Sequence, residues 1–253
     1  MKIAIVKLSA LGDIVHAMVV LQFIKKFNKE ISIDWIVEDS YKDLLKSNPH
    51  INKVYLINIK HAKKKKSLLA LIKEFKKVLK LPNYDLVIDM QGLIKSAFVS
   101  KLIPSKQTLG FDKFSSREGL SALFYNKTFN YGYDKNVIER NISLIEFALS
   151  LDVNKLEIIN KEPFLFYSQE YLIMGLSHKK KNILIIPGAS HESKRYPISN
   201  FSQIINLIDA NFFIIWGDNN EKILAEKIRA ISPSVNICDK LSIDSLISVI
   251  SQM

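Results

Sequence analysis

Short apolar runs alternate with longer amphipathic stretches along the first part of the chain. Ile3–Val6 and Leu86–Asp89 are typical of buried strands, while residues 14–27 carry apolar side chains at helical spacing. Ser67–Leu79 repeats the helical pattern. This alternation predicts the α/β class, with a doubly wound parallel sheet covered by helices on both faces. Residues 109–134 are less regular and rich in aromatic side chains.

The strand and helix pattern restarts after a polar, basic break at residues 178–181. Ile183–Ile186 and 212–216 predict strands, and 198–208 predicts a helix. We therefore expect two α/β units that face each other across a cleft, at residues 1–178 and 179–253. The second range holds roughly 75 residues, whereas an α/β domain usually takes ~100–150. We expect this second domain to be incomplete.

The net charge and the cysteine count exclude several classes of protein and indicate the charge of the partner. The 253 residues carry a net charge of +11, which predicts an anionic partner. A single cysteine excludes a disulfide framework and a cysteine-rich zinc site. No stretch reads as a membrane span or a complete signal peptide, so we expect a cytoplasmic protein.

The loop after the first strand is the first candidate site. It runs over residues 7–13 and opens a helix, so its backbone N–H groups face the edge where α/β sheets bind ligands. Gly12 is its only glycine, which argues against a dinucleotide-binding fingerprint and a P-loop. Asp13 is either the N-cap of that helix or a carboxylate acting as general base.

Two loops of the second domain and one lysine run are the other candidates. Residues 187–197 include Ser190 and Lys194, which suit a phosphate, although a basic surface loop has the same composition. Glu221 lies early in a predicted helix, where it accepts hydrogen bonds from ribose hydroxyls or complements the helix dipole. Lys60–Lys66 reads as a solvated surface or as a site for an acidic sugar or a lipid phosphate. It has no accompanying nucleic-acid-binding motif.

Ser9–His16 has the letters SALGDIVH, and this segment resembles the N-terminal motif of the lipopolysaccharide heptosyltransferases, the type I enzymes in particular. The other matching segments are 35–39, 85–96, 110–112, 116–118, 123–126, 139–141, 187–197 and 216–221. The resemblance runs along the whole chain.

The resemblance implies a GT-B fold of two Rossmann-like domains, with an acceptor-binding domain at residues 1–178 and the first part of a nucleotide-sugar-binding domain at 179–253. It implies an inverting transfer of L-glycero-D-manno-heptose from ADP-heptose to Kdo of Kdo2-lipid A. It implies Asp13 as catalytic base, and Ser190, Lys194 and Glu221 as donor-binding residues. Acceptor-binding positions are implied at Lys60, Lys63, Lys64 and Arg117. It implies no metal or other cofactor, no nucleic-acid partner, and peripheral attachment to the cytoplasmic face of the inner membrane.

The chain also departs from the family pattern. Ala10 replaces the usual serine, and the acceptor segment is rich in lysine instead of arginine, which loses bidentate carboxylate recognition. The family's Gly-Asp-Thr-Gly-x-x-His loop is absent from these 253 residues, so we expect weak donor binding and little activity. A type II or III heptosyltransferase remains an alternative, as does an inactive form that only binds an anionic glycolipid.

Overall fold

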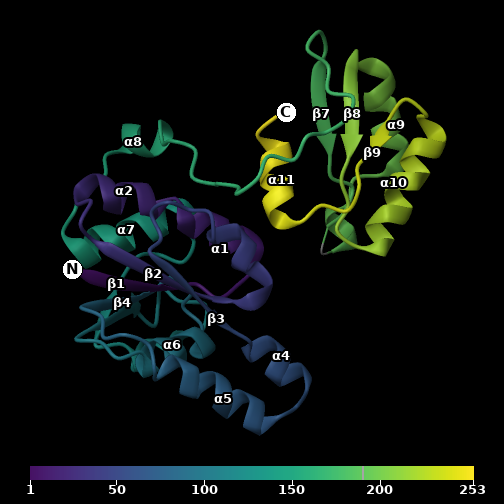
Figure 1. The fold of residues 1–253 in the computed structure, drawn as a ribbon. Helices are drawn as coiled ribbons and strands as arrows, with labels where there is room; N and C mark the ends of the chain where they lie inside the picture. The colour runs from purple at the N-terminus through teal and green to yellow at the C-terminus, as the bar shows by residue number, and fades with distance from the viewer. Residues whose placement is uncertain (190) are drawn as a thin grey trace. The chain divides into compact units, whose positions relative to one another are not determined.

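The computed structural model describes residues 1–189 and 191–253. It divides into two compact units, Met1–Leu165 and Phe166–Met253. Each unit contains a parallel sheet with helices packed against it (Figure 1). The α/β class predicted from the sequence is therefore correct for both units.

The first unit is built on a six-stranded sheet in the order β3-β2-β1-β4-β5-β6, with every pair parallel. This is the strand order of a Rossmann fold. The strands β2 and β3 are added on one side of β1, and β4 to β6 on its other side, so the strand order reverses between β1 and β4. The strands are β1 (Lys2–Val6), β2 (Ser32–Glu38), β3 (Lys53–Ile57), β4 (Leu86–Asp89), β5 (Thr108–Phe111) and β6 (Lys127–Phe129).

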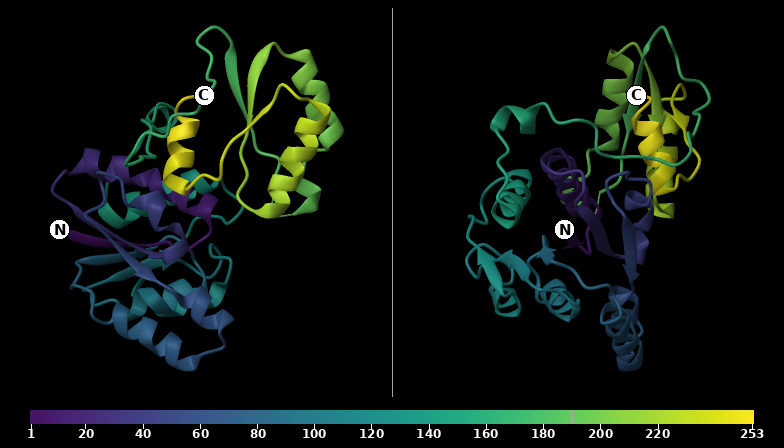
Figure 2. Two further views of the ribbon diagram at one scale, coloured as in Figure 1. Left: turned by 45° about the vertical axis from the view of Figure 1, so that its right-hand side comes forward. Right: turned by 60° about the vertical axis from the view of Figure 1, so that its left-hand side comes forward.

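The two faces of this sheet are covered by different helices. Figures 1 and 2 show α1, α2 and α7 on one face and α5 and α6 on the other. Covered on both sides, the central strand β1 is wholly apolar from Ile3 to Val6, and these residues are fully buried. The helices are α1 (Leu11–Met18), α2 (Val20–Phe27), α3 (Lys42–Leu45), α4 (Ile59–Lys64), α5 (Leu68–Val78), α6 (Ile94–Leu102), α7 (Val137–Leu149) and α8 (Lys155–Ile159), with 3-10 turns η1 (Asp39–Tyr41) and η2 (Gly119–Phe124).

The aromatic middle of the chain is more regular than the sequence suggested. It supplies β5, η2 and β6, the last of only three residues. Phe129 of β6 stacks on Phe147 of α7, with ring centroids 4.7 Å apart, and lies 6.5 Å from Phe111 of β5. These short strands depend on packing between distant segments, which a local hydrophobic pattern does not reveal.

The second unit holds a smaller parallel sheet, β7-β8-β9, within its described residues. Ile185, Phe212, Ile214 and Ile228 form its core. Helices α9 and α10 pack together on one face of this sheet, and α11 lies on the other (Figure 1). The elements are β7 (Lys181–Ile185), η3 (Glu192–Lys194), α9 (Ile198–Leu207), β8 (Ala210–Ile214), α10 (Asn219–Ile231), β9 (Asn236–Ile237) and α11 (Ile243–Ile250).

The two units divide before the expected boundary between residues 178 and 179. The reason is that the segment after Leu165 pairs with α11 through side chains far along the chain. The Ser168 hydroxyl donates to the Asp244 carboxylate at 2.8 Å, and the Tyr171 N–H donates to the Ser248 hydroxyl at 2.8 Å. Residues 169–177 are irregular. No helix among the described residues has the length and apolar character needed to cross a bilayer.

Candidate active site

A cavity of about 330 Å³ lies at the point where the strand order of the first unit reverses. The loop after β1 contributes Lys7, Ser9 and Asp13 to its walls, and the loop after β4 contributes Met90 and Gln91. Open α/β sheets bind ligands at this edge, beyond the carboxyl ends of the strands. Both loops leave adjacent parallel strands, which is why residues some eighty positions apart in sequence meet here.

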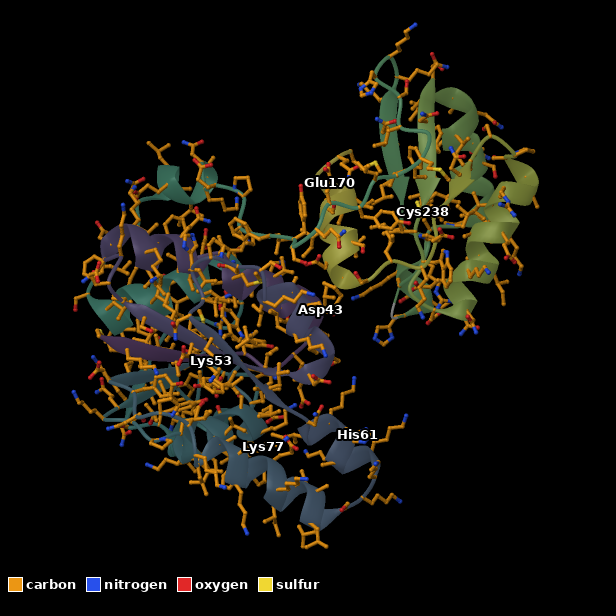
Figure 3. All side chains as sticks on the ribbon, viewed as in Figure 1. Asp43, Lys53, His61, Lys77, Glu170 and Cys238 are labelled. Carbon is orange, nitrogen blue, oxygen red and sulfur yellow. The ribbon has the colours of Figure 1, made fainter. Side chains whose placement is uncertain are left out.

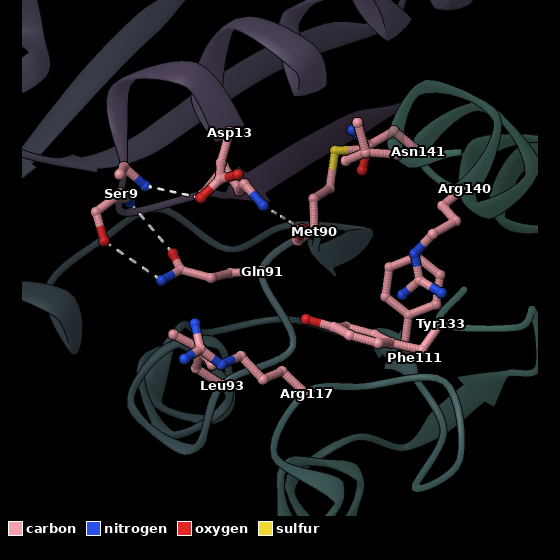
Figure 4. A pocket seen from close by; sticks show the side chains of 13 residues that line it. Ser9, Asp13, Met90, Gln91, Leu93, Phe111, Arg117, Tyr133, Arg140 and Asn141 are labelled. Atoms are coloured by element: carbon pink, nitrogen blue, oxygen red, sulfur yellow. Dashed lines mark hydrogen bonds between the residues drawn. The ribbon is translucent and has the colours of Figure 1, made fainter. Parts of the chain in front are cut away.

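Gln91 joins the two loops by hydrogen bonds to the backbone. Its Oε1 accepts from the N–H groups of Leu8 at 2.7 Å and Ser9 at 3.3 Å, and its Nε2 lies 3.5 Å from the Ser9 hydroxyl (Figure 4). These contacts fix the path of the chain immediately before α1. Gln91 therefore helps to set where Asp13 lies in the cavity.

Asp13 is exposed to the cavity and is not the N-cap of α1. Ala10 occupies the N-cap, and Asp13 is the third helical residue. Its Oδ2 accepts the Ala10 N–H at 3.2 Å, which satisfies one of the free N–H groups at the helix start. Ala10 has no side-chain oxygen, so only this half of a capping box forms. No described residue hydrogen-bonds to Oδ1, which leaves that oxygen for a ligand.

Lys7 places a buried amine in the same cavity. Its side chain is 6% exposed, and Nζ donates to the Met90 carbonyl at 2.9 Å. Burial lowers the pKa of Lys7, while the nearby carboxylates of Asp13 and Asp89 act in the opposite direction. A lysine here adds positive potential next to Asp13.

Arg140 of α7 holds the far wall of the cavity. Its guanidinium donates to the carbonyls of Tyr131, Gly132 and Ser115 at 2.8, 2.6 and 2.5 Å. It also lies 4.4 Å from the ring centre of Phe111 and 5.1 Å from that of Tyr133. Burial lowers the pKa of Arg140. Three of its N–H donors bind backbone carbonyls, so Arg140 joins two loops and shapes the wall.

Two other polar groups of the cavity have donors to spare. Arg117 is exposed and makes no ion pair with any described residue, and in the view of Figure 4 it lies across Gln91 from Asp13. Asn141 is 2% exposed, and its Nδ2 finds no hydrogen-bond partner among the residues described. A buried amide without a partner costs free energy unless a ligand supplies an acceptor. The cavity thus offers a carboxylate beside unpaired cationic and amide donors.

Asp89, at the end of β4, does not line the cavity, but its hydrogen bonds hold the loop that does. It is fully buried, and it accepts hydrogen bonds from Gln91 N–H at 2.7 Å, Gly92 N–H at 3.2 Å and the Tyr125 hydroxyl at 2.9 Å. Burial raises the pKa of Asp89, and these hydrogen bonds oppose the rise. Gly110 leaves the space for the Tyr125 ring, because a Cβ there would lie 2.4 Å from it.

A second group of candidate residues lies in the second unit, after β7 and β8. Glu221 accepts the Gly217 N–H at 2.6 Å, and its Oε1 would be 2.1 Å from a Cβ placed on Gly188. Gly188 therefore lets Glu221 lie against the loop that follows β7. Lys194 is exposed on η3 of that same loop. Ser190 is outside the described residues.

The sequence of this chain was compared with known protein families and with individual proteins. Residues 72–253 match glycosyltransferase family 9 (heptosyltransferase). Lipopolysaccharide heptosyltransferase 1 of Campylobacter coli is 40% identical over 98% of this chain and 75% of its own length. The chain belongs to glycosyltransferase family 9. It is a glycosyltransferase, as the resemblance of its motifs predicted.

Further relatives and solved structures agree with family 9 membership. Lipopolysaccharide heptosyltransferase 1 of Escherichia coli K12 is 25% identical over 99% of this chain and 79% of its own length. The structure of E. coli heptosyltransferase WaaC with ADP-2-deoxy-2-fluoro heptose matches with a TM-score of 0.83 at 23% identity, over all of this chain and 80% of that one. E. coli heptosyltransferase II matches with a TM-score of 0.67 at 17% identity, over all of this chain and 77% of that one. These structures support the predicted GT-B fold class.

The lysines predicted from this family's acceptor segment lie outside the Asp13 cavity. Residues 59–64 form helix α4, which is followed by a turn. Lys60 and Lys64 line a separate cavity of about 480 Å³, and Lys63 is exposed on the same helix. Of the predicted acceptor residues, only Arg117 shares the cavity with Asp13.

Several polar residues of this candidate site had no catalytic or binding role assigned from the sequence. Lys7 lies in the loop of residues 7–13, and Gln91, Arg140 and Asn141 lie in the matching segments 85–96 and 139–141. Tyr133 gave no signal. No group of three potential metal ligands occurs among the described His, Cys, Asp and Glu residues.

Proposed function

We propose that this family 9 chain transfers L-glycero-D-manno-heptose from ADP-heptose to a Kdo hydroxyl of Kdo2-lipid A. The observation that carries the proposal is the shared cavity of Asp13 and Arg117, with a carboxylate oxygen and a guanidinium both unpaired among the described residues. A carboxylate can accept the proton of a sugar hydroxyl, and an unpaired arginine suits the carboxylate of an acidic sugar.

In the proposed reaction Asp13 is the general base. Its Oδ1 takes the proton from the Kdo hydroxyl as that oxygen attacks the anomeric carbon of the heptose. The bond from the anomeric carbon to the diphosphate oxygen breaks on the opposite face, so the configuration inverts. The products are the heptosylated acceptor and ADP, and Asp13 holds the proton. Arg117 and the nearby Lys7 amine stabilise the bound anionic sugar.

The donor residues of this proposal are Lys194, Glu221 and Ser190. Lys194 is exposed without a salt bridge to any described residue, so its ammonium is available to the diphosphate that gains charge as ADP leaves. Glu221 has one oxygen on the Gly217 N–H and the other beside Gly188, and a ribose hydroxyl would donate to it. This arrangement needs no metal ion.

The acceptor has further anionic groups that we assign to Lys60, Lys63 and Lys64. Lysine binds phosphate as a compact charge, which suits the phosphates of lipid A. We propose that the chain meets this glycolipid as a peripheral protein on the cytoplasmic face of the inner membrane.

The type I reaction is favoured over type II by relatedness. Several matching curated relatives, from Campylobacter coli and Escherichia coli among others, bear the name lipopolysaccharide heptosyltransferase 1. A type II enzyme requires an acceptor that already carries heptose.

The test compares two acceptors. Protein that carries this sequence together with the family's Gly-Asp-Thr-Gly-x-x-His loop is incubated with ADP-heptose and either Kdo2-lipid A or its heptosylated product, and the mass of the glycolipid is followed. A gain of one heptose on Kdo2-lipid A alone is the expected result. Transfer only to the heptosylated acceptor would reassign the chain to the type II reaction. ADP binding without transfer to either acceptor would reject the proposal.

A further inference from the structure

We propose that the α4–α5 hairpin docks on an anionic phospholipid bilayer, with leucines of α5 entering the lipid interface and lysines meeting the head groups. This inference rests on the proposed function for its biological setting, but it is carried by separate observations. It concerns the tip of the hairpin, defined here as Lys65, Lys66, Leu68, Leu69 and Ile72.

The charge of the hairpin is strongly one-sided. Residues 59–80 contain nine lysines and a single carboxylate, Glu74. That carboxylate is buried and already paired with Lys77 at 2.6 Å. Figure 3 labels His61 on α4 and Lys77 on α5 and shows nitrogen-tipped side chains projecting from this hairpin. The exposed charges of the hairpin are therefore almost all positive.

Apolar side chains stand directly beside these cations. Leu68 and Leu69, in the first turn of α5, are 71% and 80% exposed, and Ile72 lies one turn further along the helix. Exposed leucines next to a lysine run are the composition of helices that lie in a membrane interface. A nucleic-acid surface would present aromatic stacking platforms or base-reading groups at this place.

Two buried carboxylates, Glu74 and Glu38, anchor the base of the hairpin. Glu74 accepts the Asn58 N–H at 2.9 Å and so joins α5 to the start of α4. Glu38, buried at the end of β2, accepts the Lys60 N–H at 3.1 Å and pairs with Lys95 of α6 at 3.1 Å. A preorganised surface loses less conformational entropy on binding.

The position of the hairpin agrees with a glycolipid acceptor. It follows β3, and the Asp13 cavity follows β1 and β4, so both lie at the carboxyl edge of one parallel sheet. The Glu38 N–H donates to the Leu8 carbonyl at 3.2 Å, which ties the strand beside the hairpin to the loop before Asp13. Docking here would bring the cavity to the membrane surface where a lipid-linked sugar stands.

The test measures sedimentation with vesicles that contain no acceptor glycolipid. The vesicles are pure phosphatidylcholine, or phosphatidylcholine with one third phosphatidylglycerol. The parent chain is expected to bind the anionic vesicles, with affinity falling as salt is raised. Lys65→Gln with Lys66→Gly should reduce partitioning about 30-fold at low salt. Glycine suits the positive φ of Lys66, so this variant keeps the turn.

The leucine variant separates membrane insertion from simple charge attraction. Leu68→Ser with Leu69→Ser should reduce partitioning about tenfold, and this loss should persist at high salt. The matched controls are Leu207→Ser, whose side chain is 83% exposed in the second unit, and Lys155→Gln with Lys240→Gln. Both controls should bind like the parent.

Several outcomes would overturn the proposal. One is equal binding to both vesicle types, and another is equal loss in the controls and the hairpin variants. If the leucine variant instead changes the sedimentation coefficient or the unfolding temperature without vesicles, protein covers the leucines. Transfer to a delipidated acceptor is measured in parallel. Vesicle binding without transfer would count against the proposed function alone, and transfer without vesicle binding against the docking surface alone.

Discussion

Asp89 offers a direct test of how the cavity floor is held. Removing its carboxylate in Asp89→Ala leaves the N–H groups of Gln91 and Gly92 and the hydroxyl of Tyr125 without their acceptor. A buried donor left unpaired costs about 1–3 kcal/mol. The Gln91 N–H is only partly buried, so water replaces part of its loss. We therefore expect the free energy of unfolding of the first unit to fall by about 3–5 kcal/mol.

Asp89→Asn is the matched control for this loss. Its amide oxygen still accepts the two backbone N–H groups, and its NH₂ can donate to the Tyr125 oxygen. We expect a stability within about 1 kcal/mol of the parent chain near pH 5. The comparison separates the hydrogen bonds from the charge.

The charge of Asp89 also changes how the free energy of unfolding depends on pH. Burial raises the folded-state pKa of Asp89 above its ordinary value of 3.8. The folded state therefore binds more protons than the unfolded state. The stability that this proton binding adds is fully present below the unfolded pKa. It is lost as pH rises through the raised folded pKa. Asp89→Asn lacks it, so the stability of the Asn variant should rise relative to the parent as pH increases from 4.

The fluorescence of a single tryptophan can report on the unfolding of the first unit alone. Trp35 is fully buried in β2 of the first unit, and Trp216, the other tryptophan, lies in the second unit. Urea unfolding of the three chains is followed by fluorescence in a Trp216→Phe background at several pH values. A loss below 1 kcal/mol in Asp89→Ala, or an Asn variant that follows the pH profile of the parent, would refute the reasoning.

Three further changes test the walls of both candidate sites. Gly188→Ala would place a Cβ 2.1 Å from Glu221 Oε1, so displacing Glu221 should weaken ADP binding about tenfold by calorimetry, with an unchanged circular dichroism spectrum. Asn141→Leu removes a buried unpaired donor, so the first unit should be as stable as the parent or more so, while KM for the acceptor rises. Arg140→Lys loses the forked contacts to three carbonyls, so the urea midpoint should fall and Arg117-dependent acceptor binding should weaken. An unchanged ADP affinity in Gly188→Ala would contradict the role of Glu221. An unchanged acceptor KM in Asn141→Leu, or an unchanged urea midpoint in Arg140→Lys, would contradict the role given to that residue.

The sequence allowed the strands around the site to be predicted, because apolar strands and strand-end loops leave local patterns. Asp13 was found this way, and the motif resemblance added Arg117. Asn141 was missed as a site residue because its importance comes from burial without a partner, a property of packing. The guanidinium of Arg140 likewise meets carbonyls from two loops that only the folded chain brings together. The lysines predicted to bind the acceptor form a recognisable run, yet their separation from the Asp13 cavity depends on the tertiary structure.

The measurement that tests the central claim most directly is heptose transfer by Asp13→Asn. The asparagine oxygen can still accept the Ala10 N–H, so α1 should begin as it does now. General-base catalysis contributes about 10²–10⁴-fold, so kcat should fall by at least about 100-fold. ADP affinity should stay within about twofold, because the proposed donor residues lie in the other unit. A kcat within about tenfold of the parent would contradict the assignment of Asp13 as the base.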